Sequence, residues 1–172
     1  MMSKKLLSPI IAAIFLMLTA CGFQLRGDHE LPQPLHRLYL EADNPYGSLE
    51  SSLRRTLRSS DVILTNTAQV ASVTLKLYKP IQTNTNTTMG PSSQSRAFAL
   101  TYQVRYALVD PQGHILLGPE NLATSRSLIL SANQLPQSNN QSDVLKHEME
   151  RDIINQLYNR LNSEQVAELF KN

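Results

Sequence analysis

The side chain best suited to covalent chemistry is the thiol of Cys21, the only cysteine among 172 residues. It stands in the run Leu18-Thr19-Ala20-Cys21-Gly22, where two small residues come directly before it. A thiol is a strong nucleophile, and at such a point it can take a diacylglycerol group, followed by an N-acyl chain such as palmitate. We therefore interpret this run as a lipoprotein processing site, with Cys21 as the lipid attachment residue.

The twenty residues before Cys21 have the organisation of a secretory leader. Lys4 and Lys5 form a short positive head, and residues 6–18 form an apolar run interrupted by one serine and one proline. A membrane-spanning helix needs about 20 apolar residues, so this run is too short to cross a bilayer. The alternative is a plain secretory signal followed by a cysteine, and the small residues directly before Cys21 favour the lipoprotein.

Cleavage before Cys21 would change the chemistry that the chain can perform. The full sequence has 16 basic and 14 acidic residues, but Lys4 and Lys5 leave with the leader, so the mature chain has 14 of each. This balance gives no support for binding to nucleic acid, which requires a clustered cationic face. Lipid would also consume the only thiol, which leaves none for a disulfide or a metal.

The residue after the lipidated cysteine indicates a destination. In bacterial lipoproteins an Asp at that place favours retention in the inner membrane, and this chain has Gly22 instead. We therefore expect a lipid-anchored protein on the periplasmic face of the outer membrane. A single acyl chain anchors only weakly, whereas the several chains of such a lipid would hold firmly.

The other polar residues match no catalytic or metal-binding motif. The helical run 147–151 has His147 but lacks the second histidine of a zinc-protease helix, and no nucleophile elbow or phosphate-binding loop is present. Glu148, Glu150 and Asp152 are expected on a solvated helix face. We predict that the protein is not an enzyme and needs no cofactor or metal beyond the lipid on Cys21.

Alternating and four-residue spacings predict the elements of one folded domain. A half-buried strand is expected at 35–42, an amphipathic helix from Ser48 to about Ser60, and a second strand at 70–81. The uncharged run 82–95 is expected to be a long loop or the tip of a flexible hairpin.

The second half of the chain has the clearest pattern. Strict alternation predicts a strand at 97–109, followed by a tight turn at 110–113. A returning strand is expected from His114, interrupted by Gly118-Pro119 and continued through 122–130. After a polar connection, apolar residues at four-residue spacing predict a helix that opens at Ser142 or Asp143.

The order of these elements predicts an α+β fold, with two α-helices packed on one face of a mixed, roughly four-stranded β-sheet. The domain organisation that follows is a signal peptide at 1–20, a lipidated tether at 21–34 and a single periplasmic domain at 35–172.

Four short motifs together give the sequence a family resemblance. They are Cys-Gly-Phe-Gln-Leu-Arg-Gly at 21–27, the Pro45-Tyr46-Gly47 turn with Leu49 beyond it, the pair Tyr102-Gln103, and Arg126-Ser127 ahead of the C-terminal helix. The chain resembles the LptE (RlpB) family of lipopolysaccharide-assembly lipoproteins over nearly all of its mature length.

The resemblance implies a fold, a partner and a role. The implied fold has two helices and four strands, and the implied partner is the large outer-membrane barrel LptD, inside which the lipoprotein sits as a plug. Together the two proteins insert lipopolysaccharide into the outer leaflet, with no catalytic step by the lipoprotein. A barrel lumen is polar and wet, which suits the Asn, Gln, Ser and Thr of 82–95 and 131–142. Without the resemblance, the composition of these runs would favour ordinary solvated connections.

Lipopolysaccharide carries phosphates, for which Arg and Lys are suitable partners. Each cation could instead be an ordinary solvated charge. The candidates are Arg96 and Arg126, followed by Lys76, Lys79 and Arg105.

Two other functions remain open from the sequence. One is a free-standing periplasmic lipoprotein that binds a lipid or an envelope polymer, and the other is a cryptic envelope hydrolase. Co-isolation with a barrel would separate the plug from the free-standing lipoprotein.

Overall fold

The computed structural model describes residues 31–171 except 88–94 and 132–137, all within one compact unit, Leu31–Asn172. The predicted leader, Cys21 and most of the predicted tether lie outside the described residues. The elements are η1 (Gln33–His36), β1 (Arg37–Ala42), α2 (Ser48–Ser59), β2 (Ile63–Leu64), η2 (Ala68–Val70), β3 (Val73–Leu77), β4 (Ile81–Thr87), β5 (Ser95–Val109), β6 (Ile115–Ser131), α3 (Ser138–Leu161) and α4 (Glu164–Glu168).

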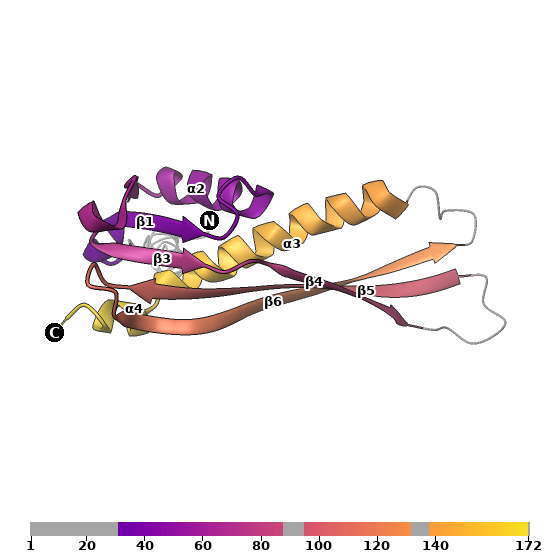
Figure 1. The fold of residues 1–172 in the computed structure, drawn as a ribbon. Coiled ribbons are helices and arrows are strands. Elements are labelled where there is room, and N and C mark those ends of the chain that lie inside the picture. The colour runs from indigo at the N-terminus through magenta and orange to yellow at the C-terminus, as the bar shows by residue number, and fades with distance from the viewer. Residues whose placement is uncertain (1–30, 88–94, 132–137, 172) are drawn as a thin grey trace, which may run out of the picture. The chain divides into compact units, whose positions relative to one another are not determined.

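The strands form one mixed sheet built around β5 (Figure 1). β3 and β4 follow each other along one edge of β5, and β6 pairs with its other edge, all antiparallel. β1 pairs with β3, and β2 pairs with β1, both in parallel. The predicted α+β class with a mixed sheet is confirmed, and the sheet has six strands in the described residues rather than about four.

Helices α2 and α3 lie on the same face of the sheet, as Figure 1 shows. The predicted apolar stripes are buried in one core: Leu49, Leu53 and Leu57 of α2, and Met149, Ile153, Leu157 and Leu161 of α3. Four-residue spacing puts such side chains on one side of a helix, which explains why both stripes could be predicted. Each buried side chain of this size contributes about 1.5–3 kcal/mol.

Strand β5 supplies the centre of this core. Its alternate side chains Leu100, Val104 and Leu108 are buried beneath the helices, with Tyr102 and Tyr106 among them. The intervening Thr101, Gln103 and Arg105 lie on the other, more exposed face, which has no helix over it in Figure 1. The predicted alternation of this strand is confirmed.

The prediction of a loop over 82–95 is wrong for its first part. Residues 81–87 form β4, which pairs with β5 from Ile81 opposite Gln103 to Thr87 opposite Ala97. The described side chains 81–85 are all exposed, so the usual signal of a half-buried strand is missing. Threonine is nevertheless a good strand former, and backbone pairing with β5 is sufficient here. Residues 88–94 lie outside the described residues.

Other boundaries also differ from the prediction. The strand expected at 35–42 begins only at Arg37, after η1, and the strand expected at 70–81 is shortened to β3, Val73–Leu77, because η2 precedes it and Ile81 already belongs to β4. Helix α3 begins at Ser138, earlier than Ser142 or Asp143. Strand β6 runs without a break from Ile115 to Ser131, because a register shift accommodates the Gly118-Pro119 pair that was expected to interrupt it. A bulge of this kind lets a strand carry a proline and continue.

Candidate functional site

The structure distributes the predicted cationic residues over two faces of the sheet. Lys76 and Arg105 lie on the face opposite the helices, since they alternate with the buried residues of β3 and β5. Arg126 pairs with the buried Leu100 and therefore lies on the helix-covered face. The backbone of Arg96 pairs with Leu130, while its side chain is outside the described part. Among the described side chains, Arg126 therefore does not share a site with Lys76 and Arg105.

The sheet face opposite the helices holds a small cationic cluster around Tyr78. The Arg105 guanidinium carbon lies 5.2 Å from the centre of the Tyr78 ring, and Lys76 Nζ lies 6.0 Å from it. Lys76 Nζ also lies 2.9 Å from Glu41 Oε1, and this hydrogen bond raises the pKa of the Lys76 ammonium. Arg105 has no carboxylate partner among the described residues, so it is the better placed of the two to meet an anion.

Arg126 has a structural partner on the facing helix. Its guanidinium is paired with the carboxylate of Asp152 on α3, which also accepts a hydrogen bond from Thr124 Oγ1 at 3.4 Å. The Arg126 side chain is 41% exposed. A phosphate would therefore have to compete with Asp152, whereas the ion pair itself fastens α3 to β6.

Lys79 lies beside an open hollow of about 530 Å³. Its backbone N–H donates to Asp43 Oδ2 at 2.9 Å, which fixes the chain after β3 against the turn that leads into α2. The hollow lies between that turn, the first residues of α2, the start of β4 and α3. Its lining includes Asn44, Ser48, Glu50, Lys79, Lys146 and Glu150.

Two buried carboxylates line this hollow. Glu150 on α3 is 2% exposed, and its Oε1 accepts a hydrogen bond from Ser48 Oγ at 2.6 Å. His147 Nδ1 lies 3.3 Å from the other oxygen, and Lys146 Nζ lies 3.9 Å from Oε1. The prediction of a solvated face is thus wrong for Glu150. Its spacing of four and seven residues from Ile154 and Leu157 was the signal that it shares their buried side.

Burial controls the protonation of this cluster. Desolvation raises the pKa of Glu50, which is 3% exposed, and the nearby charge of Glu150 raises it further. The pKa of Tyr102 is also raised, first by burial and then by Glu150, so its hydroxyl stays protonated as a hydrogen-bond donor. The cluster joins α2, α3 and β5 through polar contacts inside an otherwise apolar core.

The Pro45-Tyr46-Gly47 turn has a steric reason for its glycine. A Cβ built on Gly47 would lie 2.0 Å from Glu50 Oε2, closer than any side chain allows. Gly47 is also the N-cap of α2, and Glu50 is the third helical residue. The glycine therefore leaves room for the Glu50 side chain in the first turn of the helix.

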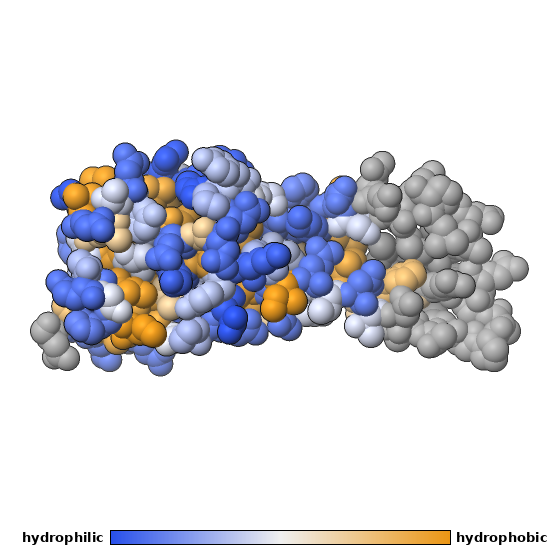
Figure 2. Space-filling model, in the orientation of Figure 1, coloured by the Kyte–Doolittle hydropathy of each residue, from blue (hydrophilic) through white to orange (hydrophobic). Residues whose placement is uncertain are grey.

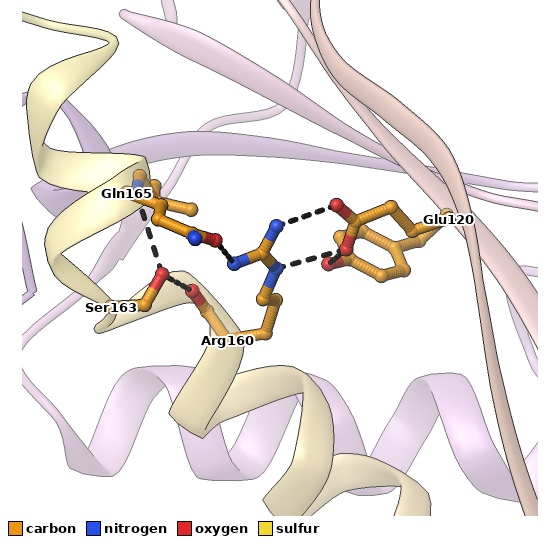
Figure 3. A network of polar contacts seen from close by, with 6 residues as sticks. Glu120, Arg160, Ser163 and Gln165 are labelled. Atoms are coloured by element: carbon orange, nitrogen blue, oxygen red, sulfur yellow. Dashed lines mark hydrogen bonds and ion pairs between the residues drawn. The ribbon is translucent and has the colours of Figure 1, made fainter.

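A second polar network fixes the end of α3, as Figure 3 shows. Arg160 donates to both oxygens of Glu120, from Nε at 3.0 Å and from Nη2 at 2.7 Å. The buried Tyr106 donates its hydroxyl to Glu120 at 2.6 Å, and Arg160 also contacts Gln165 of α4. This network holds β5, β6, α3 and α4 together, and its residues have a structural rather than a chemical role.

The described residues 31–171, with their two gaps, contain no group of three or more His, Cys, Asp or Glu side chains that could hold a metal ion. In the same part of the chain no helix is both long and apolar enough to span a bilayer. Cys21, the predicted lipid attachment residue, lies outside it.

Comparison with known proteins identifies the chain's relatives. Residues 35–161 match the model of a family described as "LptE: Lipopolysaccharide-assembly". The LPS-assembly lipoprotein LptE of Photorhabdus laumondii is 25% identical over 155 residues, covering 90% of this chain and 79% of that protein. The protein of the same name from Yersinia pestis is 25% identical over 169 residues, covering 98% and 81%.

Solved structures share the fold. An uncharacterized lipoprotein B from Nitrosomonas europaea aligns with a TM-score of 0.70 at 23% identity, covering 85% of this chain and 94% of the other. The rare lipoprotein B from Shewanella oneidensis aligns with a TM-score of 0.65 at 19% identity, covering 75% and 96%.

Proposed function

We propose, from the premise that this chain belongs to the LptE family of non-enzymatic lipopolysaccharide-assembly lipoproteins, that it plugs the outer-membrane barrel LptD and helps to assemble it. In this role the pair inserts lipopolysaccharide into the outer leaflet. The observation that carries the proposal is the family match over residues 35–161, which takes in α2, α3 and every described strand.

The exposed surface suits the interior of a barrel. A barrel lumen is polar, so a plug requires hydrogen-bonding side chains rather than a broad apolar surface. The hydroxyls of Thr101 and Ser125 lie on the sheet face opposite the helices, 2.9 Å apart, and β4 adds only neutral polar side chains after Ile81. On the face drawn in Figure 2, hydrophilic residues predominate, and the hydrophobic residues that reach the surface lie mainly toward the left of the view.

The anchoring part of the proposal rests on the sequence. Residues 1–20 are removed as a signal peptide, Cys21 receives its lipid, and residues 21–34 connect it to the domain at 35–172. The lipid holds the protein on the periplasmic face of the outer membrane. Mass spectrometry of the mature protein should detect an acylated N-terminal cysteine, and an unmodified Cys21 would contradict this part.

Lipopolysaccharide phosphates are proposed to contact the cations Arg96, Arg126, Lys76, Lys79 and Arg105. Arg105 is supported by its exposed place beside Tyr78 and its lack of a carboxylate partner in the described part of the chain. Arg126 would have to exchange Asp152 for a phosphate.

Reversing or removing the charge of individual arginines tests these contacts with lipopolysaccharide. Arg96→Glu combined with Arg126→Glu should weaken lipopolysaccharide binding and leave barrel association intact, and Arg105→Gln should weaken it separately. Arg151→Gln is the matched control, because Arg151 is an exposed cation of α3 without an ion pair in the described residues. Circular dichroism checks that each variant is folded. If a folded variant binds lipopolysaccharide as well as the wild type does, its substituted residues do not contact the phosphates.

Co-isolation tests the plug itself. The mature protein is extracted from membranes in a mild detergent and purified by affinity, and the ratio of barrel to lipoprotein is measured. A fixed ratio is expected. Purification of the lipoprotein without any barrel protein would contradict the plug proposal and would favour a free-standing periplasmic binding lipoprotein.

A further inference from the structure

The sheet has three free edges in the described residues, and they differ in how they are protected. On the first edge, β2 has only two residues, which is too short to recruit another strand, and the part of β1 that extends beyond it carries the charged Glu41. β6 has 17 residues but carries Pro119 and the charged Glu120 and Arg126. Prolines and charges are the usual means by which natural proteins prevent pairing at an edge. The third edge, on β4, has neither.

The outer edge of β4 offers backbone groups for pairing. All seven residues of β4 pair with β5 on one side, and within the described residues no strand pairs on the other. Alternate residues of an antiparallel strand direct their N–H and C=O groups to opposite sides. Three or four of these seven residues therefore point both groups away from β5.

The side chains of β4 narrow the class of partner. After Ile81 the strand reads Gln-Thr-Asn-Thr-Asn-Thr, without a charge, a proline or a glycine. It has no cation for a phosphate, and the described residues 82–85 are exposed and polar, so it has no apolar face for lipid. The group complementary to unpaired N–H and C=O groups along an extended chain is another extended backbone.

We propose that the outer edge of β4 receives an extended, uncharged segment of the barrel chain, which pairs with it as an added strand. This inference rests on the proposed function and deepens it by naming the contact. A closed barrel wall has no free strand edges, but outer-membrane barrels have long loops whose backbone is available. Pro80 and Gln82 border the open hollow of about 530 Å³, which leaves space at the start of β4 for the end of such a segment.

Hydrogen–deuterium exchange of the full lipoprotein, alone and in its purified complex with the barrel, tests the pairing. In the complex, the outward amides of residues 81–87 should exchange at least about tenfold more slowly, because they become hydrogen-bonded. Exchange that stays within about twofold in an intact complex would overturn the inference and leave the proposed function standing. Failure to form any complex would instead contradict the proposed function.

Two internal comparisons exclude other causes of slower exchange. Equal slowing along the outer edge of β6 would indicate general shielding from solvent and would overturn strand addition. Slowing in residues 81–87 that rises with protein concentration, without any barrel, would identify a second copy of this chain as the occupant and would also overturn it.

A pair of proline variants tests the edge by a second route. Thr83→Pro and Asn84→Pro change neighbouring residues, so one removes an N–H that points toward β5 and the other removes an N–H that points outward. The variant that keeps the melting temperature of the free protein identifies the outward position. That variant should bind the barrel at least about tenfold more weakly, and wild-type binding by it would overturn the inference. If both variants unfold, the exchange experiment decides.

Discussion

Replacing Glu120 by Gln should destabilise the fold by about 2 kcal/mol, because it breaks the network that holds the end of α3. The Glu120 carboxylate accepts two hydrogen bonds from Arg160 and one from Tyr106. The Arg160 and Glu120 side chains are 28% and 31% exposed. Fully exposed pairs contribute about 0.2–1 kcal/mol, and breaking a buried pair costs about 3–5 kcal/mol, so this partly buried pair falls between them.

The network around Glu120 also determines how the loss of stability in Glu120→Gln depends on pH. The hydrogen bonds from Arg160 lower the pKa of Glu120 below its ordinary value. A carboxylate with a lowered pKa stabilises the fold above the unfolded pKa of about 4.3, and this stability is lost as the pH falls through the folded pKa. The difference between wild type and Glu120→Gln should therefore be constant from about pH 5 to 8 and shrink in more acid solution.

Thermal unfolding followed by circular dichroism measures both effects. For a domain of this size, about 2 kcal/mol corresponds to a decrease in Tm of about 4–8 °C. Glu148→Gln is the matched control, since Glu148 lies on α3 without an ion pair in the described residues, and its change should be within about 0.5 kcal/mol. An unchanged Tm for Glu120→Gln, or a difference as large at pH 3 as at pH 7, would refute the reasoning.

Three further variants test the core and the buried cluster. Glu50→Gln should raise Tm at neutral pH, because the raised pKa of Glu50 means that its ionised form destabilises the fold. This gain in Tm should vanish in acid solution, where the wild-type carboxyl is protonated. A Tm of the variant below that of the wild type at pH 7 would contradict the prediction. Leu157→Ala should lower the free energy of unfolding, measured in urea, by about 2–5 kcal/mol, whereas Val144→Ala at an exposed position should lower it little. Gly47→Ala should lower Tm, because a Cβ there would collide with Glu50, and an unchanged Tm would show that the carboxylate moves aside freely.

The sequence predicted best where periodicity reports burial. The leucines of α2 and the alternation of β5 were placed correctly, because a helix or strand with one buried side leaves a regular pattern. β4 was missed because its described side chains are exposed on both faces, so only backbone pairing with β5 defines it.

The sequence predicted less about the arrangement of the candidate site residues than about the fold. Lys76 and Arg105 were both named as candidates, but their shared position around Tyr78 depends on the register between β3 and β5, which no local pattern contains. The burial of Glu150 beside Ser48, 102 residues away in the chain, likewise depends on the packing of α2 against α3.

The most direct test of the central claim is the amount of lipopolysaccharide on the surface of cells from which this protein has been depleted. Surface lipopolysaccharide should fall as the protein is lost, together with the fraction of correctly assembled barrel, and expression of the wild-type chain should restore both. Normal surface lipopolysaccharide after full depletion, with altered wall or glycan products instead, would contradict a role in lipopolysaccharide insertion and would favour an envelope hydrolase.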